Sequence, residues 1–214
     1  MDFSHIFSPI SVGGRQLKSR LTHTKSGGGL DGTPSQFERS TAYYVAMAKN
    51  GAALVCVTVG TWPDCEGKRS VMSNVFMDDP DIQEGFRRLV EAVHQEDTLC
   101  MASLMNVEPQ ELSICELPSW DFDFQGDYNP NFKNKPAIST RRIEGMIEDF
   151  VYQCRELKKL GFDGATFYMS YRASILANAI DPVLNQRTDQ WGGSTLDERA
   201  RLPLEIFRRV KEAC

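Results

Sequence analysis

Four apolar, strand-like segments alternate with four helix-like segments, and this order constrains the fold more than any other feature of the sequence. The clearest apolar run is ALVCVT at residues 53–58, which is rich in β-branched side chains and lacks polar alternation. A run of this kind is typical of a strand covered on both faces, as in a parallel sheet. Alternating strands and helices imply parallel strands joined by right-handed crossovers. The sequence therefore predicts an α/β fold.

The predicted elements follow from hydrophobic period and turn residues. A β-hairpin opens the chain, with arms at residues 10–12 and 16–22 around Gly13 and Gly14. The expected sheet strands are residues 16–22, 53–58, 99–105 and 163–168, and the expected helices are residues 33–50, 82–93, 143–160 and 195–212. For the first helix we expect Thr33 and Gln36 to form a capping box and Gly51 to act as the stop.

Two long connections separate these elements. Residues 106–136 are rich in Pro, Asn, Asp and aromatic residues and lack any period, which is typical of a functional or disordered loop and predicts a lid-like segment. The polar stretch LNQRTDQWGGSTLDERAR, residues 184–201, precedes the last helix. We expect Ser194 to cap that helix with Asp197, and Arg187 to pair with Asp189. This stretch is therefore interpreted as scaffold.

Composition excludes several function classes. The 24 basic and 29 acidic residues give a net charge of −5, and scattered basic residues argue against binding of nucleic acid or anionic lipid. No apolar stretch approaches the roughly 20 residues needed to span a membrane, and the N-terminus lacks the features of a signal peptide. The six cysteines show no CxxC or metal-ligand spacing, so we expect reduced thiols, no metal site and a cytoplasmic location. No Rossmann or P-loop motif follows any strand.

The combination of several motifs resembles a known family. The motifs are HIFSPISVGGRQLKSRL at 5–21, DGTPSQFERSTAYYVAMAKNGAALVCVTVGT at 31–61, GFDG at 161–164 and NQRTDQWGGS at 185–194. Together they resemble the old yellow enzyme family, in its NADH:flavin oxidoreductase and 2,4-dienoyl-CoA reductase branch. The resemblance covers nearly all of the chain but corresponds to the N-terminal half of the family's barrel.

This resemblance implies a fold and a chemistry. The fold is a TIM (β/α)₈ barrel with FMN at the carboxyl ends of the strands, of which this chain supplies four β-α units after an N-terminal hairpin. Such enzymes reduce FMN with NAD(P)H and pass hydride to an activated C=C bond of a small molecule. The iron–sulfur cysteines of the reductase branch are absent from the sequence.

The resemblance also implies residues that contact FMN. They are Lys25, Ser26 and Gly27 after the first strand, Gly60 after the second, and Ser103 on the third. Lys25 can favour a reduced, anionic flavin, or it can be a solvated loop lysine. Ser103 stands where the family has a glutamine, and its side chain is too short for the same two-sided amide contact.

The catalytic positions differ from the family pattern. Tyr168 and Tyr171 replace the family's paired His or Asn donors, and Ala173 stands at the place of the usual proton-donating tyrosine. Tyrosine can donate a hydrogen bond and a proton, so Tyr168 and Tyr171 are the candidate catalytic residues. The alternative is that they are half-buried aromatics that fill the space of an absent cofactor.

Four β-α units cannot close a barrel, because an open sheet leaves two unpaired edges. Three interpretations follow. The chain is part of an FMN-dependent ene reductase completed by a partner chain, a second copy or further sequence; or it is a flavin-free, non-catalytic assembly partner; or it is a half-barrel that dimerises around an apolar ligand. The sequence does not identify the substrate.

Overall fold

The computed structural model describes residues 3–24, 33–69, 75–104, 107–109, 112–115, 136–167, 169 and 174–214. The chain separates into two compact units. The first, called the sheet unit, comprises Met1–Trp62, Met72–Met105 and Gln153–Phe167. The second, called the helical unit, comprises Pro63–Val71, Asn106–Tyr152 and Tyr168–Cys214.

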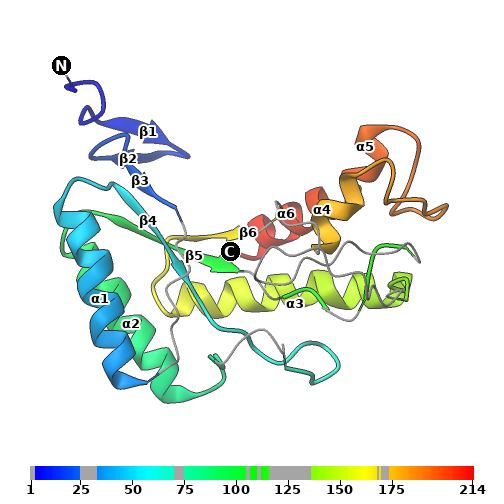
Figure 1. The fold of residues 1–214 in the computed structure, drawn as a ribbon, viewed down its shortest axis with the longest axis horizontal. Coiled ribbons are helices and arrows are strands. Elements are labelled where there is room, and N and C mark those ends of the chain that lie inside the picture. Colours follow the sequence, from blue (N-terminus) through cyan, green and yellow to red (C-terminus); the bar gives the residue numbers. More distant parts are fainter. Residues whose placement is uncertain are drawn as a thin grey trace, which may run out of the picture. The chain divides into compact units, whose positions relative to one another are not determined.

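A parallel sheet forms the centre of the sheet unit (Figure 1). Its strands, in spatial order, are β3 (Thr22–His23), β4 (Leu54–Thr58), β5 (Leu99–Leu104) and β6 (Gly164–Phe167). All neighbouring pairs are parallel, as the β-α alternation predicts. The spatial order equals the chain order, which is the order in which a barrel is built.

The N-terminal hairpin is shorter than predicted. It pairs β1 (Ile10–Val12) with β2 (Arg15–Leu17), and Gly13 and Gly14 have φ angles of 57° and 78° that suit its tight turn. The single strand expected over residues 16–22 is wrong, because β2 ends at Leu17 and β3 begins at Thr22. Ser19 interrupts the strand: its hydroxyl donates to the carbonyl of Gly51 (2.6 Å) and accepts from the amide of Leu21 (3.1 Å). These side-chain bonds replace ladder bonds and turn the chain.

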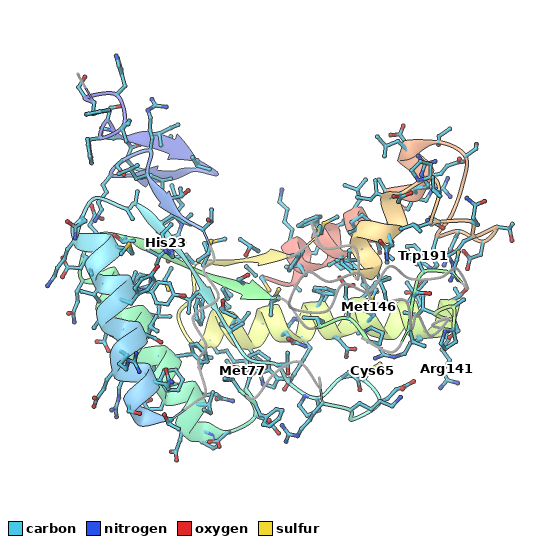
Figure 2. All side chains as sticks on the ribbon, viewed as in Figure 1. His23, Cys65, Met77, Arg141, Met146 and Trp191 are labelled. Atoms are coloured by element: carbon cyan, nitrogen blue, oxygen red, sulfur yellow. The ribbon has the colours of Figure 1, made fainter. Side chains whose placement is uncertain are left out.

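Three long helices match the predicted ones. They are α1 (Pro34–Lys49), α2 (Pro80–His94) and α3 (Thr140–Lys159). The apolar stripe predicted for α2 is buried and consists of Ile82, Phe86, Leu89, Val90 and Val93. The stripe predicted for α3 is also buried and includes Met146, labelled in Figure 2. Amphipathic period thus identified the faces that cover the core.

The ends of α1 were predicted only in part. Gly51 follows the helix with a φ of 100°, so its role as the stop is confirmed. The capping box expected at Thr33 is wrong, because the Thr33 side chain makes no cap hydrogen bond. Its hydroxyl lies 3.1 Å from the hydroxyl of Ser35 instead.

The C-terminal helical region differs most from the prediction. Instead of one helix over residues 195–212, the structure has α5 (Leu196–Arg199) and α6 (Arg201–Ala213), preceded by the unpredicted α4 (Ile175–Ile180). The cap expected at Ser194 with Asp197 is wrong by one residue, since Thr195 and Glu198 form the capping box. No helix in the described part of the chain is long and apolar enough to cross a membrane.

The core of the sheet unit lies between the sheet and its helices. Val55 and Val57 of β4 and Ala102 of β5 are completely buried. Phe86 of α2 packs edge-on against Phe37 of α1, with ring centroids 5.0 Å apart. The sheet is therefore held by α1 and α2 on one face, as in a β-α repeat.

Candidate functional site

The carboxyl ends of β3 to β6 form the candidate site, because ligands of parallel α/β sheets bind where the strands end. Three hydroxyl side chains lie at one level across this end of the sheet. Thr58 of β4 is in register with Ser103 of β5, which is in register with Thr166 of β6. Residues in register on parallel strands point to the same face of the sheet. We call these three residues the hydroxyl row.

The hydroxyl row is largely shielded from solvent but incompletely bonded. Ser103 is only 3% exposed. The Thr166 hydroxyl donates a long hydrogen bond of 3.5 Å to the carbonyl of Ala102. The Thr58 hydroxyl is buried and has no hydrogen-bond partner in the described part of the chain. A buried hydroxyl without a partner is unfavourable, and a polar ligand at this end of the sheet would satisfy it.

The chain after β4 brings a second unpartnered hydroxyl to the same end. The amide of Thr61 donates to the carbonyl of Val75 (3.0 Å), and the amide of Met77 donates to the carbonyl of Thr61 (2.9 Å). The Thr61 hydroxyl itself is buried and has no hydrogen-bond partner among the residues that the structure describes. Gly60 is required between the two threonines, because a Cβ there would lie 2.1 Å from the Val75 carbonyl oxygen. Glycine thus permits a close approach of two backbone segments.

Aromatic residues of α1 support the ends of β3 and β4. The His23 imidazole Nε2 lies 2.9 Å from the Tyr43 hydroxyl, and His23 is labelled in Figure 2. The His23 ring also makes an edge contact with Tyr44, with centroids 5.8 Å apart. Burial raises the pKa of Tyr44 to about 12, against the opposing effect of a backbone hydrogen bond with Thr58. The Tyr44 phenol therefore keeps its proton at neutral pH.

Sequence reasoning missed Thr58, Thr61 and Tyr44. The signal for the two threonines was their position beside Gly60, at the end of the most apolar strand. The signal for Tyr44 was the Tyr43–Tyr44 pair in the helix that follows the first sheet strand. Neither signal shows whether a hydroxyl has a hydrogen-bond partner, because the partner would come from a segment that is close only in the folded chain.

The structure describes only part of the predicted site. Gly60 and Ser103 lie at the ends of the adjacent strands β4 and β5, within one unit. The other predicted residues lie outside the described residues, so their roles stay predictions; they are Lys25, Ser26, Gly27, Tyr168 and Tyr171. No group of His, Cys, Asp and Glu in the described ranges could hold a metal ion.

The predicted Arg187–Asp189 pair is confirmed in the helical unit. The Arg187 guanidinium donates to both carboxylate oxygens of Asp189, at 2.9 and 2.5 Å. It also donates to the carbonyls of Ile138 (2.6 Å) and Ile114 (3.1 Å). The hydrogen bonds from Arg187 hold the pKa of Asp189 well below its usual range. Because every contact is internal, the pair supports the scaffold interpretation.

Asn185, at the start of the same motif, is also a scaffold residue. Its side-chain amide donates to the carbonyls of Ala179 (2.6 Å) and Trp191 (2.9 Å). Its side-chain oxygen accepts from the amide of Arg187 (3.2 Å). A buried asparagine with these three bonds fixes the path of the loop.

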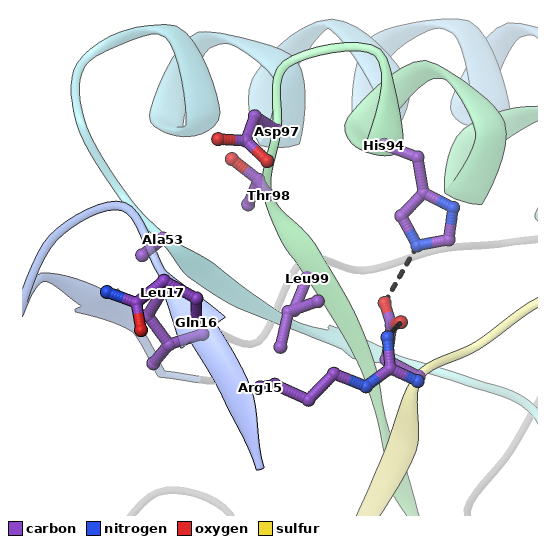
Figure 3. A pocket seen from close by; sticks show the side chains of 9 residues that line it. Arg15, Gln16, Leu17, Ala53, His94, Asp97, Thr98 and Leu99 are labelled. Carbon is purple, nitrogen blue, oxygen red and sulfur yellow. Dashed lines mark hydrogen bonds and ion pairs between the residues drawn. The ribbon is translucent and has the colours of Figure 1, made fainter. Parts of the chain in front are cut away.

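A pocket of about 320 Å³ lies at the opposite, amino end of the sheet (Figure 3). The carboxylate of Asp163 occupies one side, where it accepts from Arg15 (3.1 Å), from His94 Nε2 (2.7 Å) and from the amide of Cys100 (2.8 Å). These bonds join the hairpin, α2 and the start of β6. We interpret these bonds as structural, because the polar groups on this side of the pocket form hydrogen bonds with one another.

The carboxyl end of the sheet suits the polar edge of a planar ring. The Thr58 and Thr61 hydroxyls can each donate or accept one hydrogen bond. Ser103 lies between Thr58 and Thr166 in the sheet register. This donor set fits the carbonyl and N–H groups of a flavin, although the site lacks the amide side chain that resemblance leads one to expect at position 103.

The chain is similar to known proteins in sequence and in fold. The profile of the NADH:flavin oxidoreductase / NADH oxidase family matches residues 5–214. The chain is 28% identical to the NADH oxidase of Thermoanaerobacter brockii, over 99% of this chain and 32% of that protein. It is 27% identical to the N,N-dimethylglycine/sarcosine dehydrogenase of Chromohalobacter salexigens, over 99% of this chain and 30% of that protein.

Solved structures show the same fold. The Old Yellow Enzyme from Pichia sp. AKU4542 superposes with a TM-score of 0.72 at 25% identity, over 98% of this chain and 56% of that chain. The predicted fold, four β-α units of a TIM barrel after a hairpin, is therefore confirmed. The chain spans about a third of the length of the two curated relatives and about half of the Pichia enzyme.

Proposed function

Because the chain belongs to the NADH:flavin oxidoreductase / NADH oxidase family, we propose that its sheet unit binds one edge of FMN within an ene-reductase-like enzyme. The proposed reaction passes hydride from NAD(P)H to an activated C=C bond of a small molecule. The observation that carries the proposal is the pair of buried, unpartnered hydroxyls of Thr58 and Thr61 at the ligand-binding end of the sheet. A bound flavin supplies the hydride chemistry that no side chain can provide.

The described residues would hold and orient the ring. Thr58, Thr61 and Ser103 offer hydroxyl groups to its polar edge, and Gly60 lets the backbone approach closely. The hydroxyl of Ser103 makes one contact where an amide would make two, so we expect weaker binding than a glutamine would give. Lys25, Ser26 and Gly27 stay proposed contacts on the strength of the sequence resemblance.

The proposed proton donors are Tyr168 and Tyr171. A tyrosine hydroxyl can protonate the carbon next to the one that receives hydride. Tyr44 is a different case, because its pKa of about 12 and its deep burial assign it to supporting the end of β4. We also retain the cytoplasmic location predicted from the sequence as part of this proposal.

Turnover is proposed to require more protein than these 214 residues. Within the described residues the sheet runs from β3 to β6 without closing, while the fold of the relatives is a barrel. A partner chain, a second copy or further sequence would complete it. Exclusion of water and full enclosure of the flavin depend on that completion.

Titration of the purified chain with FMN, followed by visible absorption, tests the proposal. We expect Thr58→Val and Thr61→Val each to weaken FMN binding by roughly 2- to 12-fold, the effect of one lost hydrogen bond. Neither change should destabilise the fold, since each removes a hydroxyl that bonds to none of the described residues. The matched control is Thr22→Val at the exposed amino end of β3, which should leave binding unchanged.

Circular dichroism separates failure to bind from failure to fold. FMN binding that is unchanged in Thr58→Val and Thr61→Val contradicts the proposal, and a folded chain that binds no FMN favours the flavin-free assembly partner. Equal weakening in the Thr22→Val control also contradicts it, because the effect would then not depend on the carboxyl end of the sheet.

A further inference from the structure

The pocket at the amino end of the sheet contains charged groups that the proposed function does not use. It has a volume of about 320 Å³, within the range of small-ligand sites, and all of its lining residues belong to the sheet unit. The Asp163 carboxylate and its donors Arg15 and His94 form one side. Gln16 and Asp97 also line the pocket (Figure 3). Flavin is proposed at the carboxyl ends of the same strands, so this pocket is a separate site.

Asp97 carries a charge where the fold favours a neutral residue. It follows α2 with a φ of 51°, and its amide donates to the carbonyl of His94 at 3.0 Å. Glycine and asparagine favour this left-handed conformation at a helix end and add no charge. An aspartate instead places a carboxylate at the negative end of the helix dipole, which is unfavourable. This carboxylate has no hydrogen bond or ion pair with any described residue. A cation from outside the chain would therefore stabilise it.

The hairpin brings hydrogen-bond donors to the same pocket. Arg15 donates from Nη1 to Asp163 at 3.1 Å, while 60% of its side chain stays exposed. This is the only hydrogen bond that its guanidinium makes within the described residues. A guanidinium has five N–H donors in a planar fork, so the remaining donors can bind a carboxylate through two parallel bonds. The Gln16 side chain is also exposed and bonds to none of the described residues, so its amide can add a further donor.

Apolar surface lies between these two charged groups. Leu17 is buried, and Leu99 is partly exposed and lies between Asp97 and Arg15 in the view of Figure 3. A simple anion would be repelled by the carboxylates of Asp97 and Asp163, and a simple cation would be repelled by Arg15. A molecule with an ammonium group at one end, a carboxylate at the other and methylene groups between them would meet an opposite charge at each end.

We propose that this pocket binds a small ω-amino acid. Its ammonium group pairs with Asp97, its carboxylate accepts from Arg15 and Gln16, and its methylene chain covers Leu99. An α-amino acid carries both charges at one end, so it suits groups on either side of Leu99 less well. The bound molecule joins the hairpin to the end of α2 and offsets the unfavourable charge at that helix end. This inference does not rest on the proposed function.

Titration of the whole chain with δ-aminovalerate, followed by two-dimensional amide NMR, tests the inference. The amides of Gln16, Asp97 and Leu99 should shift together, with a dissociation constant of about 1 mM, as expected for a weakly bound ligand of this size. Pentylamine and valerate are the matched compounds, since each lacks one of the two charged groups. Each should bind at least about 10-fold more weakly, because one charge-assisted hydrogen bond is lost.

A variant and its control locate the site. Asp97→Asn keeps the size of the side chain and suits the left-handed conformation, so the chain should fold as before. It removes the charge that pairs with the ammonium group and should weaken δ-aminovalerate binding by about 10-fold. The matched control is Arg20→Gln, because Arg20 is exposed and donates to the Ser8 hydroxyl, outside the pocket. This control should bind as the natural chain does.

Three results would overturn the inference. One is the absence of amide shifts at about 10 mM δ-aminovalerate, ten times the expected dissociation constant. Another is equal binding of pentylamine or valerate, which would show that only one of the two charges is recognised. The third is unchanged binding in Asp97→Asn or equal weakening in Arg20→Gln, either of which would place the ligand elsewhere. Failure of the chain to bind FMN would not affect these readings, so the two proposals fail separately.

Discussion

Replacing Arg187 by alanine is expected to destabilise the helical unit strongly. The guanidinium of Arg187 donates to Asp189, to the carbonyls of Ile114 and Ile138, and at 3.4 Å to the Thr140 hydroxyl. Its side chain is 11% exposed. Alanine would remove these donors and leave their acceptors without hydrogen bonds. These acceptors account for most of the expected loss in the free energy of unfolding.

The magnitude follows from those acceptors. Each buried carbonyl left without a donor costs about 1–3 kcal/mol. Asp189 loses its cation, but its side chain is 33% exposed, so water can replace part of that interaction. The total should therefore lie near the lower end of the range for breaking a buried ion pair, about 3 kcal/mol.

Urea unfolding of the chain, followed by circular dichroism and tryptophan fluorescence, measures this loss. Arg208→Ala is the matched control, because Arg208 makes ion pairs with Glu205 and Glu212 on the exposed face of α6. The control should change stability little, since exposed ion pairs contribute little. Arg187→Lys should fall between the two variants, because it keeps the charge but loses the forked geometry. If Arg187→Ala is no less stable than Arg208→Ala, the scaffold role of this residue is refuted.

Three further predictions follow from single contacts. Gly60→Ala should destabilise the chain by about 1–3 kcal/mol in urea unfolding, because its Cβ would lie 2.1 Å from the Val75 carbonyl; an unchanged midpoint would contradict this close approach. Asp189 has a lowered pKa, so it stabilises the fold above about pH 4 and less as the pH falls. Asp189→Asn should therefore reduce the loss of folding stability at acid pH. If the natural chain and the variant lose stability equally, the Arg187–Asp189 pair is not the cause of that loss. Thr195→Ala should lower the free energy of unfolding by about 1 kcal/mol in thermal unfolding, because it removes the cap of α5, whereas Ser194→Ala should not. A larger loss in Ser194→Ala would instead support Ser194 as the cap, as predicted from the sequence.

Much of the fold was predictable because its signals are local. The apolar run at residues 53–58 identified β4, and the apolar period identified the buried faces of α2 and α3. Gly51 and Gly161 end helices with φ angles of 100° and 96°, a conformation that favours glycine over other residues. The hydrophobic period and the glycines at helix ends depend only on residues close together in the sequence, so both can be recognised without a structure.

The predictions that failed concern competition between neighbouring hydrogen-bonding groups. Ser194 and Thr195 are both good caps, and the backbone geometry selected Thr195 with Glu198. Ser19 interrupts the strand predicted over residues 16–22, because its hydroxyl bonds to Gly51 from another part of the chain. The sequence shows that such residues can make these bonds but does not show which one does.

The sequence by itself determined the order of β-α units, the faces that become core and the family motif at residues 185–194. Only the tertiary structure decided which polar groups are satisfied. Arg187 reaches a carbonyl 73 residues away, and Glu108 meets a helix 67 residues later. Thr58 and Thr61 lie at a sheet end where no group of the described residues bonds to their hydroxyls. Hydrophobic period is a local property, whereas hydrogen-bond partners are chosen by segments that meet only when the chain folds.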